Sequence, residues 1–227
     1  MGVKIVCTGA GARLEPNEVE LIAAAAREHG RATLLVPTFA ARDAAYRELA
    51  QAGVGLGVEV ATPATWIAAL WELFGDGRRL TGNFERQALI AALLDASEPA
   101  GIAPLRNNPG TVRLLARMVR DLAPYAGDEP CPGSGDGAAG PLTEADDMVL
   151  DLLQAYRAAA AARGFVEASE ASELLVRAFD GNPPACLRAV AVRDVCTVPA
   201  YLQRLAGLVA RGGAAGEGEV AWLLGAG

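Results

Sequence analysis

The amino-acid sequence predicts an α/β fold in which a parallel β-sheet, flanked by helices, is interrupted by an inserted, all-helical subdomain. Short apolar runs of strand character alternate with helical patterns at the N-terminal end of the chain. Strand patterns return only near the C-terminal end, and the middle of the chain shows amphipathic helices alone. Because alternating strands and helices build parallel sheets with right-handed crossovers, we expect both ends of the chain to form one sheet.

The first predicted unit is a strand, a glycine-rich turn and a helix. Val3–Thr8 is a compact apolar run that ends at Gly9-Ala10-Gly11. Glu18–Glu28 then carries apolar residues at helical spacing. We therefore expect the chain to turn sharply after its first strand and to continue as a helix.

The second unit is the strand Arg31–Val36 followed by the helix Phe39–Ala52. The strand stops at Pro37, which has no amide hydrogen to donate to a sheet. Thr38 stands where a helix N-cap belongs, because its hydroxyl can accept a hydrogen bond from the first helical turn. A third short strand is predicted at Gly57–Ala61. A buried strand that enters a helix through such a turn commonly forms one edge of an α/β ligand crevice.

From Thr62 onward the pattern becomes helical. Thr62 precedes a proline, which favours the first position of a helix, and the apolar residues that follow form one broad face. Trp66 and Trp71 lie on that face and are interpreted as core residues in preference to base-stacking residues. The Gly-, Ser- and Pro-rich residues 127–141 predict a flexible loop. Further helices are predicted at Asn83–Ala96, Thr111–Leu122, Asp147–Arg163 and Ser169–Phe179.

Strand character returns at Leu187–Val195, is followed by a helix at Thr197–Ala210, and ends with a possible last strand at Val220–Leu224. Since strands are expected only at the two ends, residues 1–61 and 185–227 are assigned to the α/β core. Residues 62–184 are assigned to the inserted helical subdomain.

Composition limits the possible functions. A formal net charge of −7 argues against a freestanding nucleic-acid-binding protein, which would carry a basic face. Any contact with a polyanion is therefore expected to be local, or shared with other protein surface. The four cysteines include no CxxC pair, so neither a zinc site nor a disulfide framework is predicted and no metal ligands are assigned. No apolar run is long enough for a membrane span and no signal pattern is present, so we expect a cytoplasmic protein without membrane contact.

Motifs in a fixed order suggest a family. The chain contains, in this order, VPTFAARDAAYRELA, VEVATPATWIAALWELFGDGRRL, NFERQALIAALL, LTEADDMVLDLLQAYRAAAAARGFVEASEASELLVRAF and RAVAVRDVCTVPAYLQRLAGL. These segments resemble the N-terminal helicase-like domain of AddB-type subunits of bacterial ATP-dependent helicase–nucleases, which are relatives of superfamily-1 DNA helicases. The resemblance implies a parallel sheet of the P-loop or RecA-like type, with the helical subdomain inserted in it.

The resemblance also implies a DNA contact. In the family, the Thr-Phe turn after the second strand and the start of the next helix touch the DNA backbone, which corresponds here to Thr38, Phe39 and Arg42. Thr62, in the turn after the next strand, is a fourth candidate. The alternative interpretation is that both threonines are ordinary helix caps and that Arg42 is a solvated surface charge.

The nucleotide site that active members of this family have is expected to be degenerate in this chain. Active members have GxxxxGK[ST], in which backbone amides and the lysine hold phosphates and the hydroxyl holds magnesium. This chain retains Gly9 and Gly11 but has no Lys-Thr pair, and Arg13 is no obvious substitute. After the late strand only Asp194 is present, where active members place an Asp-Glu pair. We therefore expect no ATP or Mg²⁺ binding and no catalysis by this chain.

The resemblance implies that such an inactivated domain guides or scans a DNA strand during double-strand-break processing. The parent protein is expected to be a subunit of an ATP-dependent exodeoxyribonuclease, longer than this chain. DNA binding is expected together with the rest of that protein and a partner helicase–nuclease subunit.

Two alternatives from other classes remain. The first is a Rossmann-like enzyme that binds a small molecule or nucleotide over Gly9-Ala10-Gly11, although Leu14 takes the position of the last glycine of GxGxxG. The second is a structural interaction module of a larger complex. His29, the only histidine, falls at a helix end and is not assigned a catalytic role.

Overall fold

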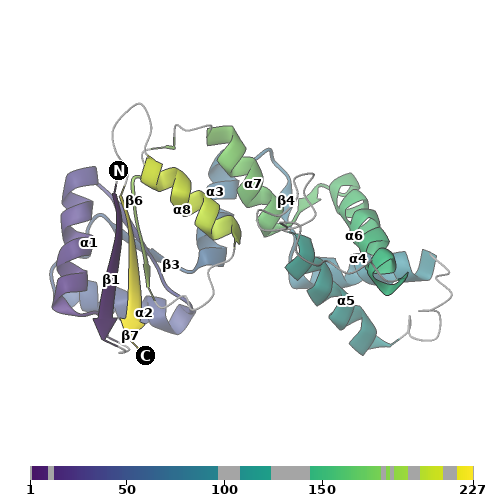
Figure 1. Ribbon diagram of the computed structural model, residues 1–227, viewed down its shortest axis with the longest axis horizontal. Helices are drawn as coiled ribbons and strands as arrows, with labels where there is room; N and C mark the ends of the chain where they lie inside the picture. The colour runs from purple at the N-terminus through teal and green to yellow at the C-terminus, as the bar shows by residue number, and fades with distance from the viewer. Residues whose placement is uncertain are drawn as a thin grey trace, which may run out of the picture. The chain divides into compact units, whose positions relative to one another are not determined.

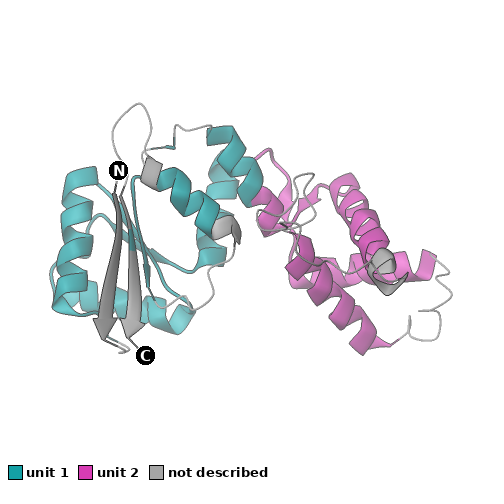
Figure 2. Ribbon diagram, viewed as in Figure 1, with its two compact units in different colours: residues 1–74, 172–227 teal, residues 75–171 magenta. Residues whose placement is uncertain are grey.

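The computed structural model describes residues 2–9, 13–96, 108–123, 144–179, 183–184, 187–193, 200–211 and 219–226. The chain forms two compact units (Figure 2). Unit 1 comprises residues 1–74 and 172–227, and unit 2 comprises residues 75–171. Each unit has an apolar core of its own.

Unit 1 is built on a five-stranded sheet in which all strands run parallel. The order across the sheet is β1-β7-β6-β2-β3 (Figure 1). The predicted α/β class and the parallel sheet formed by both ends of the chain are therefore confirmed. The strands are β1 (Gly2–Gly9), β2 (Ala32–Leu35), β3 (Val58–Ala61), β6 (Ala189–Arg193) and β7 (Glu219–Ala226).

Helices cover both faces of this sheet. Helices α1 (Pro16–His29) and α2 (Phe39–Gln51) lie on one face, and α3 (Pro63–Phe74) and α8 (Ala200–Arg211) lie on the other (Figure 1). This division follows from the topology. The chain crosses the sheet in one direction from β1 to β3 and in the reverse direction from β3 to β7, and right-handed crossovers place helices on opposite faces when the direction reverses.

The side chains of β2 show how the strands are buried. Leu34, and Val36 just after the strand, belong to a cluster with Ile22 of α1 and Leu49 of α2. Every residue of β2 is buried, as expected for a parallel strand covered by helices on both faces. Gly30 ends α1 with φ = 74°, a left-handed conformation that glycine adopts without a steric penalty, and the chain enters β2 two residues later.

The described residues of unit 2 include the helices α4 (Asn83–Ala96), α5 (Pro109–Leu122) and α6 (Glu144–Ala162). The bounds of α4 are as predicted. Helix α5 begins two residues earlier than predicted, because Pro109 occupies the first helical position and the Asn108 side chain accepts a hydrogen bond from the Gly110 amide. The core residues of these helices include Leu89, Ile90, Leu94, Leu115, Val119, Leu153 and Tyr156.

The prediction that strands occur only at the two ends of the chain is wrong. Unit 2 also contains a two-stranded parallel sheet of β4 (Arg79–Leu80) and β5 (Phe165–Val166). Each strand has only two residues, so it is too short to produce an alternating apolar pattern in the sequence. The inserted segment is therefore not all-helical.

Unit 2 spans residues 75–171, so its bounds differ from those of the predicted helical subdomain, residues 62–184. Helix α3 belongs to unit 1, and so does α7 (Ala168–Phe179) from residue 172 onward. The rings of Phe74 and Phe179 meet edge to face with centroids 5.4 Å apart, which joins the ends of these two helices. Trp66 and Trp71 are buried, as predicted for core residues. The predicted loop at residues 127–141 lies outside the described residues.

A buried polar network holds the elements of unit 2 together. Arg86 donates through Nε and Nη2 to the two carboxylate oxygens of Glu167, at 2.9 and 2.7 Å, and also to the Thr81 carbonyl at 3.3 Å. The Tyr156 hydroxyl donates to the same carboxylate. Burial, and next the hydrogen bond with Glu167, raise the pKa of the Tyr156 phenol above its ordinary value. Burial opposes the charge of Arg86, but the paired carboxylate raises the pKa of Arg86 overall.

Replacing Glu167 by glutamine is expected to destabilise unit 2 by about 3 kcal/mol, because it leaves the Arg86 guanidinium buried without a counter-charge. All three tryptophans lie in unit 1. The urea midpoint measured by far-ultraviolet circular dichroism should therefore shift more than the midpoint measured by tryptophan fluorescence, which reports on unit 1 alone. Glu170→Gln is the control, since Glu170 is more exposed and its arginine contacts are long, at 3.8 Å. Equal shifts for the two variants would contradict the role of the network.

Alkaline pH should weaken unit 2 through Tyr156. The raised pKa keeps the folded phenol protonated where an unfolded tyrosine ionises, so the free energy of unfolding falls as pH rises above about 10. Stability at neutral pH retains the full contribution of this group. Measuring urea unfolding at a series of alkaline pH values for the wild-type chain and for Tyr156→Phe should show a shallower decline in the variant. An identical decline in both would contradict the assignment.

Candidate functional site

The carboxyl ends of β2 and β6 form a topological switch point. The two strands are neighbours, but the chain leaves β2 toward β3 through α2 and leaves β6 in the opposite direction toward β7 through α8. In open parallel sheets, ligands bind outside the carboxyl ends of the strands at such a point. This edge of the sheet is therefore the candidate functional site.

The turn after β2 presents an aromatic ring and a guanidinium to solvent. Thr38 caps α2, because its hydroxyl accepts a hydrogen bond from the Ala41 amide at 3.1 Å. Phe39, the first residue of α2, is 57% exposed although it is a large apolar side chain. The Arg42 guanidinium lies 5.0 Å from the centre of the Phe39 ring and also donates to Asp43 at 3.1 Å. The structure thus brings Phe39 and Arg42 together as one surface.

Thr62 lies in a different environment from Thr38. Only 6% of Thr62 is exposed, and its hydroxyl is 3.0 Å from that of Thr65. The Thr62 amide donates to the Thr65 hydroxyl at 3.0 Å, and the Thr65 amide donates to the Thr62 hydroxyl at 3.3 Å. These reciprocal bonds are those of a helix cap at the start of α3.

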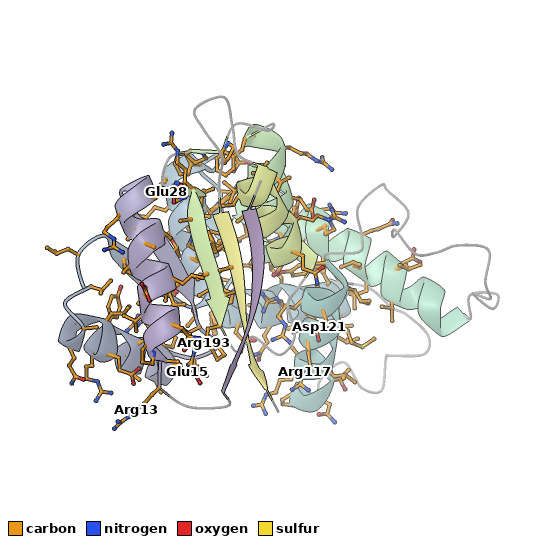
Figure 3. The ribbon with its side chains drawn as sticks, turned by 60° about the vertical axis from the view of Figure 1, so that its left-hand side comes forward. Arg13, Glu15, Glu28, Arg117, Asp121 and Arg193 are labelled. Atoms are coloured by element: carbon orange, nitrogen blue, oxygen red, sulfur yellow. The ribbon has the colours of Figure 1, made fainter. Side chains whose placement is uncertain are left out.

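A buried ion pair joins the end of β6 to the start of α1. Arg193 is 6% exposed, and its Nε donates to Oε1 of Glu18 at 3.0 Å. Its Nη2 donates to the carbonyl of Arg13 at 2.8 Å. The other Glu18 oxygen accepts from the Glu15 amide at 2.7 Å. Figure 3 shows Glu15 and Arg193 at the same end of α1, with Glu28 at the other end.

Sequence reasoning missed Glu18 and Arg193 as partners. It placed the important charge of this strand at Asp194, which lies outside the described residues. Two signals were present in the sequence. An arginine within an apolar strand requires a buried partner, and a glutamate in the first turn of a helix can cap that helix. Neither signal identifies the other residue, because 175 positions separate them.

Carboxylates occupy the N-terminus of α1. The Leu14 amide donates to Oε2 of Glu48 at 2.5 Å, and the Glu15 amide donates to Glu18. The Glu18 amide is bonded to the Asn17 side chain at 2.8 Å, and Pro16 has no amide hydrogen. A phosphate at a helix N-terminus needs free amides and a positive local field. Here the amides of residues 14, 15 and 18 already have side-chain acceptors, so they are not available to a phosphate.

The remaining predicted nucleotide-site residues are not brought together. Gly9 ends β1 opposite Ala226, and Gly11 lies outside the described residues. The exposed Arg13 side chain lines an open groove of about 760 Å³ between the start of α1 and one side of α2. Arg47 and Glu48 form part of the opposite wall of this groove. In Figure 3 the Arg13 side chain points away from the sheet.

Comparisons with known proteins give no assignment. No protein-family description matches the chain, and no curated protein matches it. Across the described residues, no cluster of three or more histidine, cysteine or acidic side chains is placed to hold a metal ion. None of the helices in that part of the chain combines the length and apolar character needed to cross a bilayer.

Replacing Arg193 by methionine should destabilise unit 1 by about 3 kcal/mol, because the buried Glu18 carboxylate loses its counter-charge. The double variant Arg193→Met with Glu18→Gln should recover part of this loss, since no buried charge then remains unpaired. Urea unfolding followed by tryptophan fluorescence measures the effect. The control is Arg27→Met, because Arg27 is an exposed residue of α1. If Arg193→Met is as stable as Arg27→Met, the Glu18–Arg193 ion pair makes no contribution to the free energy of unfolding.

Proposed function

We propose that this chain is the N-terminal, non-catalytic helicase-like part of a DNA helicase–nuclease subunit. It has a RecA-like sheet with an inserted subdomain, and it guides or scans a DNA strand during double-strand-break end processing and recombinational repair. The observation that carries the proposal is the exposed Phe39 ring with Arg42 over it, at the carboxyl edge of a parallel sheet. The order of the motifs along the chain agrees with this function.

The chemistry of this surface suits single-stranded DNA. An exposed aromatic ring stacks on a base of any sequence, and such contacts contribute about 1–3 kcal/mol per base. The Arg42 guanidinium already donates through Nε and Nη2 to Asp43, so it would contact an adjacent phosphate through its remaining N–H groups. Phe39 and Arg42 together therefore offer one base contact and one phosphate contact without reading the sequence.

The carboxylates at α1 support a role without ATP hydrolysis. Glu18 and Glu48 accept hydrogen bonds from amides at the position where a P-loop or Rossmann-type site would hold phosphates. The same arrangement makes the Rossmann-like enzyme less well supported than a DNA-guiding domain. Cytoplasmic location and assembly with a partner helicase–nuclease subunit belong to the same proposal.

Phe39→Ala should weaken binding of the chain to a fluorescein-labelled single-stranded oligonucleotide by roughly 5- to 150-fold, because one stacked base is lost. Fluorescence anisotropy at low salt measures the affinity. Phe39→Tyr should bind nearly as well as the wild type, since it keeps an aromatic ring. Leu56→Ala is the matched control, because Leu56 is an exposed apolar side chain in the turn before β3, away from the carboxyl edge.

Two outcomes would overturn the proposal. The first is a wild-type chain that shows no oligonucleotide binding at low salt. The second is tight binding of a fluorescent ATP analogue with ATP turnover, because nucleotide binding needs free amides at the start of α1 and those of residues 14, 15 and 18 already have side-chain acceptors.

A further inference from the structure

Three arginines form a stripe on the exposed side of α5 in unit 2. Arg113, Arg117 and Arg120 are all exposed and are spaced four and three residues apart. Residues at this spacing lie within about 60° of one another around a helix and span about 10 Å of its length. The core-facing residues of α5 are Leu115, Ala116 and Val119, of which Ala116 lies next to the arginines, three residues from Arg113 and four from Arg120. We call these three arginines the α5 arginine stripe.

The charge of the stripe is only partly compensated. Within the part of the chain that the structure describes, neither Arg113 nor Arg117 forms an ion pair. Arg120 pairs with its neighbour Asp121 through Nη2 and Oδ1 at 2.8 Å, with both side chains about half exposed. Like charges four residues apart on a helix repel each other and destabilise it. The repulsion between Arg113 and Arg117 therefore opposes helix formation, whereas Arg120 in the last turn interacts favourably with the helix dipole.

We propose that the α5 arginine stripe binds the phosphodiester backbone of DNA. This inference rests on the proposed function and adds a second DNA contact, in unit 2, to the contact at Phe39 and Arg42. Guanidinium groups match phosphate oxygens through paired hydrogen bonds, and a row of them can neutralise successive phosphates. A local basic stripe also explains how an acidic chain binds a polyanion.

The apolar content of the stripe favours DNA over an acidic protein partner. A stable protein interface requires an apolar, desolvated centre. Leu114, 57% exposed, is the one large exposed apolar side chain of α5. A single leucine beside three arginines is too little for such a centre, whereas phosphate binding needs only the charges.

The test uses the full chain and a labelled single-stranded oligonucleotide over a series of salt concentrations. The triple variant Arg113→Gln, Arg117→Gln and Arg120→Gln should reduce the slope of log affinity against log salt by about two, because each phosphate contact contributes about 0.7 for a single strand. By the same relation, the affinity at about 50 mM salt should fall by roughly two to three orders of magnitude. The corresponding triple lysine variant should retain most of the slope, since lysine also neutralises phosphates.

The matched control is the triple variant Arg27→Gln, Arg163→Gln and Arg177→Gln, which makes the same change in net charge at three other exposed arginines. Equal losses in both triple variants would overturn the inference, because only the overall charge would then matter. An unchanged slope in the α5 variant would also overturn it. If poly-L-glutamate displaces the labelled oligonucleotide as well as unlabelled DNA of the same total charge does, the inference is wrong and the stripe binds acidic polypeptides.

The stripe and the proposed function fail in different ways. If the α5 variant binds like the wild type while Phe39→Ala binds weakly, the inference is wrong and the proposed function stands. If the α5 variant loses affinity while Phe39→Ala does not, the stripe is a DNA contact and the site at Phe39 is wrong. If the wild-type chain binds no DNA at all, both are wrong.

Discussion

The buried ion pair between Glu18 and Arg193 is the constraint on which the candidate site depends. It joins the first turn of α1 to the last residue of β6, and Arg193 also bonds to the carbonyl of Arg13 at the entry to that helix. The strands on either side of β6 come from the two ends of the sequence. The geometry of the carboxyl edge is therefore fixed only after distant parts of the chain have come together.

The same pair influences the chemistry of the site. One Glu18 oxygen is used by Arg193 and the other by the Glu15 amide, while Glu48 accepts from the Leu14 amide. At this helix terminus the protein's own carboxylates therefore accept from the Leu14 and Glu15 amides, which leaves these amides unavailable to an anion. Among the described residues at the carboxyl edge, Phe39 is exposed with Arg42 beside it, a surface suited to base stacking and phosphate contact.

Unit 2 uses the same physical solution in another place. Arg86, Glu167 and Tyr156 come from different elements, and their bonds are short and buried. A buried charge in an apolar core requires such a partner. Among the described residues, Arg86–Glu167 in unit 2 and Arg193–Glu18 in unit 1 are buried pairs that join elements distant in sequence. The exposed arginines of α5 differ from these, because they are solvated and two of them have no acidic partner within the described residues.

The sequence by itself determined the types of most elements and many of their bounds. The periodicity of Asn83–Ala96 predicts α4. Pro37 and Thr38 indicate where β2 ends and where α2 is capped. Trp66 and Trp71 lie on the apolar face of a predicted helix, which indicates that they are buried. These signals are local, since each depends on residues within a few positions. The tertiary structure alone decided the strand order, the β4–β5 pair and the partner of Arg193. These features depend on contacts between residues far apart along the chain, and no short-range pattern records which distant segments will meet.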